Sequence, residues 1–195
     1  MSRGTKARGK GNQLRIIGGQ WRGRKLAFMP AEGLRPTTDR VRETLFNWLA
    51  PDIHGARCLD LFAGSGALGL EALSRGAASC DFVERDIATL AQIEKHLQTL
   101  DARDRGHCHR GAAEDFLARE NAPWDIVFID QPYGHQLVGP SCELLEHQQL
   151  LTENAVIYIE TSAAESLPRL PQGWNLHREK KAGDVCYRLF IVGSA

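Results

Sequence analysis

Long apolar runs are missing from this sequence of 195 residues. Its apolar stretches are only a few residues long, far below the ~20 that a helix needs to cross a bilayer. The opening stretch MSRGTKARGKGNQ also lacks the apolar core of a signal peptide. These absences argue against a membrane-spanning or secreted protein. We therefore expect a cytoplasmic protein with no membrane partner.

Paired cysteines are missing too. The five cysteines are odd in number, widely spaced and form no C-x-x-C, so neither a disulfide framework nor a zinc finger is indicated. His107 and His109 are the closest candidate metal pair, but no third ligand stands near them in the sequence. We expect no metal, and since the sequence has no heptad stripe, we expect a monomer.

The net charge is zero, but the charge is divided along the chain. Residues 1–42 contain eleven lysines and arginines against Glu32 and Asp39, a balance of +9, so the rest of the chain carries −9. A basic segment of this kind binds phosphates without reading their sequence, which suits nucleic acid. Two of its members, Arg40 and Arg42, could instead form ion pairs on a helix surface. The candidate RNA-binding residues are Arg15, Arg22, Arg24, Lys25, Arg35, Arg40 and Arg42.

The basic segment has two parts. Residues 1–12 contain mainly Gly, Lys, Arg, Ser, Thr and Asn, and this composition predicts a disordered tail that either binds nucleic acid or merely solubilises the chain. Residues 13–54 are expected to be structured and to contact RNA. In this part LRIIGGQWRGRKLAF predicts a hairpin around Gly18-Gly19. TTDRVRETLFNWL predicts a helix whose apolar face contains Val41, Leu45, Trp48 and Leu49.

From residue 55 onward, short apolar runs alternate with segments of helical spacing. Strands are predicted at 57–62, 79–84, 106–110, 125–130 and 155–160. Helices are predicted at 67–75, 87–100, 112–120 and 141–149. WNLHREKK and DVCYRLFIV, joined by Ala182-Gly183, predict a final antiparallel hairpin. The pattern is typical of an α/β, Rossmann-like fold whose mostly parallel sheet binds ligands at the carboxyl ends of its strands.

A glycine-rich loop follows the first of these strands. CLDLFAGSGALGLEAL places Gly64, Gly66 and Gly69 in a G-x-G-x-x-G pattern. Such glycines let backbone N–H groups approach a ligand. Glu84 ends the next strand, about twenty residues later, where a carboxylate can bind both hydroxyls of a ribose. The two features together predict a cofactor that contains a nucleoside.

Two cofactors fit this pattern. NAD would place its pyrophosphate at the helix N-terminus, where negative charge is favoured. Asp60, just before the loop, suits instead the cationic methionine end of S-adenosylmethionine, although it could also cap the helix. An NAD-dependent oxidoreductase stays an alternative, with His135 as its candidate proton donor.

The stretch IVFIDQPYGH ends an apolar strand on a carboxylate, a proline and an aromatic ring. The exocyclic amine of a nucleobase is a poor nucleophile, because its lone pair is conjugated into the ring. A site that methylates this amine must accept its hydrogens and hold its nitrogen in line with the methyl group. Asp130 and the backbone carbonyl of Gln131 can be the acceptors, Pro132 fixes the turn, and Tyr133 offers a face to an unstacked base. A plain turn at the end of a strand is the alternative.

These stretches together resemble a known family. D-Q-P-Y is similar to the (N/D/S)-P-P-(Y/F/W) motif of amino-methyltransferases. RIIGGQWRGRKL, GLRPTTDRVRETLFNWL, DLFAGSGALGLEALSRGA and LHREKKAGDVCYRLF resemble the RsmD-type methyltransferases, over nearly all of residues 14–191. Gln131 departs from the family pattern, which has proline there. The departure removes one fixed φ angle and predicts reduced preorganisation rather than lost activity.

The resemblance implies a class I S-adenosylmethionine-dependent methyltransferase fold, with a seven-stranded sheet and residues 55–195 as the catalytic domain. It implies catalytic roles for Asp130, Gln131, Pro132 and Tyr133. The cofactor residues it implies are Asp60, Phe62, Ala63, Gly64, Ser65, Gly66, Glu84, Arg85, Ala113, Glu114 and Asp130.

RsmD-type enzymes convert one guanine of bacterial small-subunit ribosomal RNA to N2-methylguanine. The resemblance therefore implies that this chain methylates a guanine of 16S ribosomal RNA, on an assembled or partly assembled 30S particle. One alternative is an adenine-N6 DNA methyltransferase, which a D-x-P-Y site would serve equally well, although the chain has no separate domain for reading DNA sequence. A second is a non-catalytic RNA-binding ribosome assembly factor, motivated by Gln131.

Overall fold

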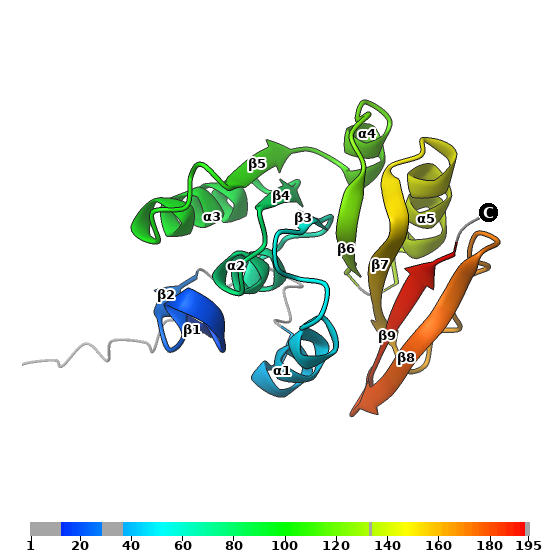
Figure 1. Ribbon diagram of the computed structural model, residues 1–195, viewed down its shortest axis with the longest axis horizontal. Coiled ribbons are helices and arrows are strands. Elements are labelled where there is room, and N and C mark those ends of the chain that lie inside the picture. The colour runs from blue at the N-terminus through cyan, green and yellow to red at the C-terminus, as the bar shows by residue number, and fades with distance from the viewer. Residues whose placement is uncertain (1–12, 29–36, 133, 194–195) are drawn as a thin grey trace, which may run out of the picture.

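The computed structural model describes residues 13–28, 37–132 and 134–193, most of which build a seven-stranded sheet and the helices that cover it (Figure 1). The strand order is β5-β4-β3-β6-β7-β9-β8, in which β3 to β7 are parallel and β9 and β8 form an antiparallel hairpin at one edge. The strands are β3 (Arg57–Asp60), β4 (Ser79–Glu84), β5 (Gly106–Arg110), β6 (Trp124–Asp130), β7 (Leu151–Ser162), β8 (Trp174–Ala182) and β9 (Val185–Val192). The predicted α/β class and the predicted C-terminal hairpin are confirmed.

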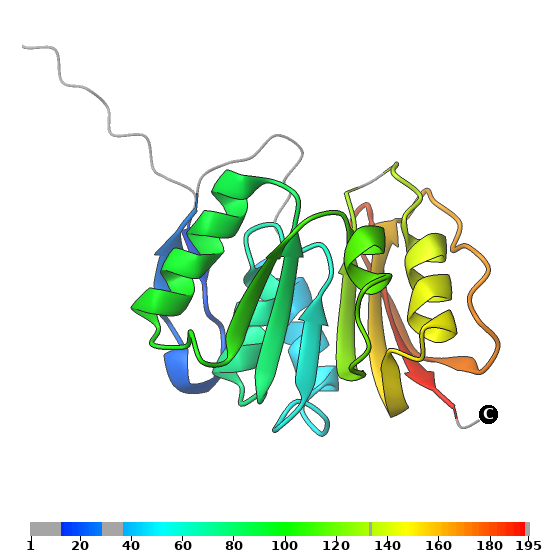
Figure 2. The ribbon, with the colours of Figure 1, turned by 90° about the horizontal axis from the view of Figure 1, so that it is seen from above.

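Helices cover both faces of the sheet (Figures 1 and 2). On one face α1, α2 and α3 share a buried apolar cluster with the strands, and on the other α4 and α5 form a second cluster. Apolar side chains on either face of β6 are therefore covered by helices, and Ile126 to Ile129 are completely buried. The helices are α1 (Asp39–Trp48), α2 (Ala67–Ser74), α3 (Ile87–Thr99), α4 (Ala113–Leu117) and α5 (Val138–His147).

The predicted elements are present, with shifted ends. The first strand of the domain stops at Asp60 rather than at residue 62, because the chain there turns into the glycine loop. Helix α4 ends at Leu117, three residues short of the prediction. Strand β7 is longer than predicted, because it pairs with β6 on one side and with β9 on the other, and these pairings extend from Leu151 to Ser162.

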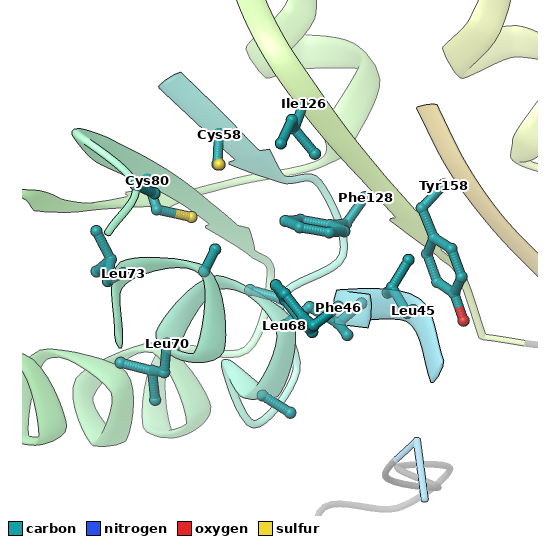
Figure 3. Packing of buried hydrophobic residues seen from close by; sticks show 14 of the residues in the cluster. Leu45, Phe46, Cys58, Leu68, Leu70, Leu73, Cys80, Ile126, Phe128 and Tyr158 are labelled. Carbon is teal, nitrogen blue, oxygen red and sulfur yellow. The ribbon is translucent and has the colours of Figure 1, made fainter. Parts of the chain in front are cut away.

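Helix α1 brings the N-terminal segment onto the sheet. Thr38 caps it by accepting a hydrogen bond from the backbone N–H of Val41. The apolar face of the helix packs on the strands, and the ring of Phe46 lies 5.9 Å from that of Phe128 on β6. Tyr158 of β7 lies beside them, completely buried (Figure 3). Residues on both sides of position 54 therefore contribute to the same core.

The predicted N-terminal hairpin is present as the antiparallel pair β1 (Gln13–Arg15) and β2 (Lys25–Ala27). The connection is longer than a Gly-Gly turn and contains a 3₁₀ turn, Gly19–Trp21. Gly19 has φ +73°, and a Cβ atom there would lie 1.9 Å from the carbonyl oxygen of Ser74, so only glycine allows the loop to approach α2 this closely. The proposed tail at residues 1–12 lies outside the described residues.

Glu71 of α2 anchors this hairpin. Its side chain is completely buried, and its two oxygens accept hydrogen bonds from the backbone N–H groups of Ile17, at 2.8 Å, and Gly18, at 2.7 Å. Nε of Arg75 lies 2.7 Å from Glu71 and Nη1 of Arg42 lies 3.6 Å from it. A buried carboxylate is tolerated only with such partners, and here the partners join the hairpin, α1 and α2.

None of the helices in the described part of the chain is long and apolar enough to span a membrane.

Candidate active site

A cavity in the described part of the structure lies at the carboxyl ends of β3 and β6. Strand order reverses between these two neighbours, which is where ligands bind in open α/β sheets. The cavity has a volume of about 360 Å³, within the range of small-molecule sites. Its walls contain residues from the glycine loop and from the ends of β4, β6 and β7.

The glycine loop follows β3 as predicted. Gly64 and Gly66 have φ of +51° and +76°, in the left-handed region that favours glycine. Gly64 lines the cavity, whereas Gly66 is the residue that precedes α2 and donates its N–H to the carbonyl of Ala63 at 2.7 Å. Gly69 faces away from the cavity toward β4, where a Cβ atom would lie 2.2 Å from the ring of Phe82. The three glycines therefore serve different purposes, although the sequence pattern is one.

Glu84 connects this loop to the end of β4. One carboxylate oxygen accepts a hydrogen bond from the N–H of Gly64 at 2.9 Å, and the other accepts one from the N–H of Asp86 at 2.9 Å. A carboxylate has about four lone-pair positions, so these two bonds leave acceptor capacity for ribose hydroxyls. The bond from Gly64 thus holds the glycine loop beside Glu84, where the ribose of a nucleoside would bind.

Asp60 is buried at the end of β3 and accepts a hydrogen bond from the N–H of Gly69 at 2.9 Å. Burial raises the pKa of Asp60 to about 7, against the lowering effect of that bond. Asp60 thus does stabilise the start of α2, as the alternative interpretation proposed, and it also lines the cavity. Both roles are compatible, because a cationic ligand would stabilise the ionised form of a buried acid whose pKa is raised.

The remaining predicted cofactor residues lie in the same place. Each one lines the cavity, from three different strand ends: Phe62, Ala63, Ser65, Arg85, Ala113 and Glu114. Together with Asp60, Gly64 and Glu84 they form the wall of the cavity that follows β3, β4 and β5, and Glu84 and Arg85 make it polar beside β4. These residues fit a nucleoside-containing ligand by the size of the cavity, the approachable loop backbone and the two acids.

Asp130 lies at the end of β6, beside this wall. Its Oδ2 accepts a hydrogen bond from the hydroxyl of Thr37 at 2.8 Å. Burial and the neighbouring charge of Glu160 raise the pKa of Asp130 well above its usual range, and the bond from Thr37 lowers it. Glu160 is the residue paired with Asp130 on the adjacent parallel strand β7, and it lines the same cavity.

Gln131 and Pro132 follow Asp130 and line the cavity. The side chain of Gln131 is buried, and its Oε1 accepts a hydrogen bond from the backbone N–H of Leu137, just before α5. This bond closes the loop between β6 and α5. It therefore compensates in part for the rigidity that a proline at position 131 would have supplied. Tyr133, the fourth predicted catalytic residue, lies outside the described residues.

Most of the predicted RNA-binding residues are on the surface. Arg15, Arg22, Arg24, Lys25 and Arg40 are exposed, and Arg35 lies outside the described residues. Arg42 is different: its side chain is 1% exposed, and its Nη2 donates to Asp39 at 2.7 Å and to the carbonyl of Arg15 at 3.0 Å. Arg42 is therefore buried away from RNA. It forms a helix ion pair with Asp39, as the alternative predicted, but as a buried cation that also connects α1 to the hairpin.

Several residues that line the cavity were not predicted as site residues, among them Thr37, His135, Leu137 and Glu160. His135 was considered only for hydride chemistry. A signal for Glu160 did exist, because it ends an apolar strand with an acid as Asp130 does, in NAVIYIE. Within the described ranges, no group of three or more His, Cys, Asp or Glu side chains could hold a metal ion.

Comparison with known proteins decides the family. Residues 14–191 match the family described as Conserved hypothetical protein 95. The chain belongs to this family. It is also 54% identical to ribosomal RNA small subunit methyltransferase D of Escherichia coli strain K12, over 91% of this chain and 89% of that protein. The protein of the same name from Haemophilus influenzae is 47% identical, with 91% and 93% coverage. The resemblance to RsmD-type methyltransferases is confirmed.

Solved structures agree with this membership in the Conserved hypothetical protein 95 family. The Escherichia coli protein yhhF superposes with a TM-score of 0.88 at 50% identity, over 94% of this chain and 100% of that one. An RNA methyltransferase from Salinibacter ruber, solved with S-adenosyl-L-homocysteine, has a TM-score of 0.60 at 14% identity, over 83% of this chain and 95% of that one, and it shows likeness of fold alone. The chain is thus a member of an S-adenosylmethionine-dependent methyltransferase family.

Proposed function

We propose that this protein transfers a methyl group from S-adenosylmethionine to the exocyclic N2 amine of a guanine in small-subunit ribosomal RNA. The observation that carries the proposal is the position of Asp130 and Gln131, at the end of β6 and in the same cavity as the glycine loop. The names of the two relatives that are 54% and 47% identical support ribosomal RNA as the substrate. They do not favour a DNA methyltransferase or a non-catalytic assembly factor.

The cofactor would be held by the glycine-loop side of the cavity. Glu84 would accept the ribose hydroxyls, Ala113 and Glu114 would lie near the adenine, and Asp60 would face the cationic methionine end. Phe62, Ala63, Gly64, Ser65 and Arg85 would complete the wall, with Gly66 shaping the loop. Bound S-adenosylmethionine would supply an electrophilic methyl group for direct transfer to N2, with S-adenosylhomocysteine as the leaving group and no covalent enzyme intermediate.

The residues at the end of β6 would act on the base. The carboxylate of Asp130 and the backbone carbonyl of Gln131 accept the hydrogens of the amine, which orients its nitrogen lone pair toward the methyl group. Asp130 then acts as an acceptor rather than as a strong base, because the proton leaves after the nitrogen has become cationic. Pro132 fixes the turn, and Tyr133 would stack on the base.

RNA would be bound by the exposed cations of the N-terminal segment, namely Arg15, Arg22, Arg24, Lys25 and Arg40, with Arg35 added from the sequence pattern. Their contacts would be to phosphates and so independent of base sequence. The natural substrate would be an assembled or partly assembled 30S particle in the cytoplasm, with a single copy of this chain acting on it.

The test uses small ribosomal subunits from a strain that lacks this gene. The subunits are incubated with the protein and S-adenosylmethionine, and the digested RNA is analysed by mass spectrometry. We expect new N2-methylguanosine, and none with Asp130→Ala, although that variant should still bind the cofactor. Methylated adenosine instead of methylated guanosine would reject the proposed base, and wild-type turnover by Asp130→Ala would reject the assignment of Asp130.

A further inference from the structure

Glu160 is a buried acid inside the cavity that the roles assigned above do not use. It belongs to β7, is 4% exposed and lines the cavity with Asp130 and Thr37. The hydroxyl of Tyr158 donates a hydrogen bond to its Oε2 at 2.7 Å, and Tyr158 itself is completely buried. An acid fixed by a neighbour in this way is oriented, not merely tolerated.

The sheet sets the position of Glu160 relative to Asp130. The two residues are direct partners in the parallel pairing of β6 and β7, so their side chains point to the same face. Phe128 and Tyr158, the partners two residues earlier, lie in the same apolar cluster, which confirms that face. Adjacent strands are about 4.8 Å apart, so the backbones that carry the two acids are about one strand spacing apart. Strand β7 is on the side of β6 opposite to the glycine loop.

We propose that Glu160 is the residue that selects guanine, by accepting a hydrogen bond from the N1–H group while Asp130 accepts one from the N2 amine. This inference rests on the proposed function. On the Watson–Crick edge of guanine the two donors are neighbours, so a base that binds with this edge toward β7 presents N1–H to Glu160 while its N2 amine meets Asp130. Adenine presents instead an acceptor, N1, beside its amine, and a carboxylate repels an acceptor.

The charges of the two acids support this assignment. Burial and the charge of Glu160 raise the pKa of Asp130, so the pair is costly to ionise without a ligand. Two adjacent N–H donors relieve this repulsion, because each carboxylate gains a charge-assisted hydrogen bond. Hydrogen bonds from Thr37 to Asp130 and from Tyr158 to Glu160 orient the two acids.

The test replaces Glu160 and the target base together. Glu160→Gln keeps the shape of the side chain and its ability to accept the Tyr158 hydroxyl, but its amide can also donate. The probe base is 2-aminopurine, which has the N2 amine but an acceptor at N1. Small subunits are reconstituted with ribosomal RNA that carries either guanine or 2-aminopurine at the position methylated by the wild-type protein, and N2-methylation of each is followed by mass spectrometry.

We expect the wild-type protein to prefer guanine over 2-aminopurine by at least about 100-fold in kcat/KM, since a buried acceptor loses its donor in the analogue. In Glu160→Gln this ratio should fall below about tenfold, because the amide can bind either base. The dissociation constant for S-adenosylmethionine should stay within about twofold of wild type, which shows that the variant is folded. The matched control is Glu179→Gln, a half-exposed acid paired with Arg188 outside the cavity, and it should leave the ratio unchanged.

The variant Tyr158→Phe distinguishes a role of Glu160 in base selection from an effect of side-chain packing around it. It keeps the buried ring and removes the hydrogen bond to Glu160, so we expect slower methylation of guanine and no gain with 2-aminopurine, because the carboxylate is still present. An unchanged base ratio in Glu160→Gln would overturn the role of Glu160 while leaving the proposed function intact. If the wild-type protein methylates no guanine at all, the proposed function fails, and this inference fails with it.

Discussion

The hydroxyl of Thr37 donates a 2.8 Å hydrogen bond to Oδ2 of Asp130, across 93 positions of sequence. The bond connects the segment just before α1 to the end of β6, so the basic N-terminal part of the chain touches the acid on which methylation depends in our proposal. It also lowers the pKa of Asp130, against the effects of burial and of Glu160.

Removing this bond in Thr37→Val should raise the pKa of Asp130 further. Because the amine hydrogens need an ionised acceptor, the acidic limb of the pH–rate profile should move to higher pH, and kcat at neutral pH should fall. The measurement is kcat against pH with saturating S-adenosylmethionine. Thr38→Val is the control: it removes the N-cap of α1 and costs about 1 kcal/mol of stability, but it should leave the limb in place. If the acidic limb of the pH–rate profile lies at the same pH in Thr37→Val and Thr38→Val, the bond from Thr37 does not control the pKa of Asp130.

Asp60 should release a proton when the cofactor binds. Its pKa is raised to about 7 by burial, so most of it is protonated at pH 6, and a cationic ligand would lower that pKa and expel the proton. Calorimetry at pH 6 in buffers of different ionisation enthalpy should give different apparent binding enthalpies. Asp60→Asn should abolish the difference. Equal enthalpies for the wild-type protein would argue against a cationic group at Asp60.

The exposed cations of the hairpin should determine the salt dependence of RNA binding. For each phosphate that a variant no longer binds, the slope of log K against log salt should decrease by roughly 0.7–0.9. Arg22→Gln and Lys25→Gln, both on the surface, should therefore flatten the slope when binding to small subunits is measured over a salt series. Arg103→Gln, an exposed arginine before β5, is the control. A slope that stays the same in the hairpin variants would refute their role.

Gln131 should act through its side chain. Gln131→Ala removes the acceptor for the N–H of Leu137 and should loosen the loop before α5, with a several-fold lower kcat. Gln131→Pro should be less harmful, because proline replaces the missing bond by a fixed φ angle. Single-turnover rates on small subunits, with the cofactor saturating, distinguish the two. Equal rates for Gln131→Ala and the wild-type protein would mean that the bond has no part in positioning.

The same substitution should have opposite effects on two helical glycines. In Gly69→Ala the new methyl group would lie 2.2 Å from Phe82 and 2.8 Å from Sγ of Cys80, and overpacking of this kind costs about 1–3 kcal/mol. In Gly139→Ala of α5 the nearest atom is Cβ of Pro168, at an ordinary 3.5 Å, so helix propensity should stabilise the protein by up to about 1 kcal/mol. Urea denaturation measures both. A stabilised Gly69→Ala would contradict the contact.

The parts of the structure that could be predicted from the sequence are those encoded by the local pattern of residue types. The strands from β3 to β7 and their helices follow from apolar periodicity, and the cofactor wall follows from a loop whose glycines and acids are close in sequence. Local pattern marks Glu160 as an acid that follows an apolar run, but it does not show that Thr37 and Glu160 meet Asp130, because Thr37 does so across 93 positions and Glu160 across a strand pairing. Both contacts exist only once α1 lies on the sheet and the register of β7 is set.

Arg42 shows the limit of reasoning from charge. Its position in a basic segment suggested an exposed cation, but it follows Val41 and precedes Leu45 on the face of α1 that packs on the protein. Its buried partner, Glu71, stands in α2, whose residues are all buried. Each charge looks out of place in its own helix. The two groups lie 3.6 Å apart, and closer partners, Asp39 for Arg42 and Arg75 for Glu71, complete the network.

The anchoring of the hairpin by Glu71 has a consequence for synthesis of the chain. Glu71 stands 54 and 53 positions after the two backbone N–H groups that it binds. At about 5–20 residues per second, translation needs roughly 3–10 s to cover that distance. During this interval the basic hairpin has been made but its anchor has not. Each new copy therefore presents its arginines to its surroundings, beside a translating ribosome, before the fold that restrains them exists.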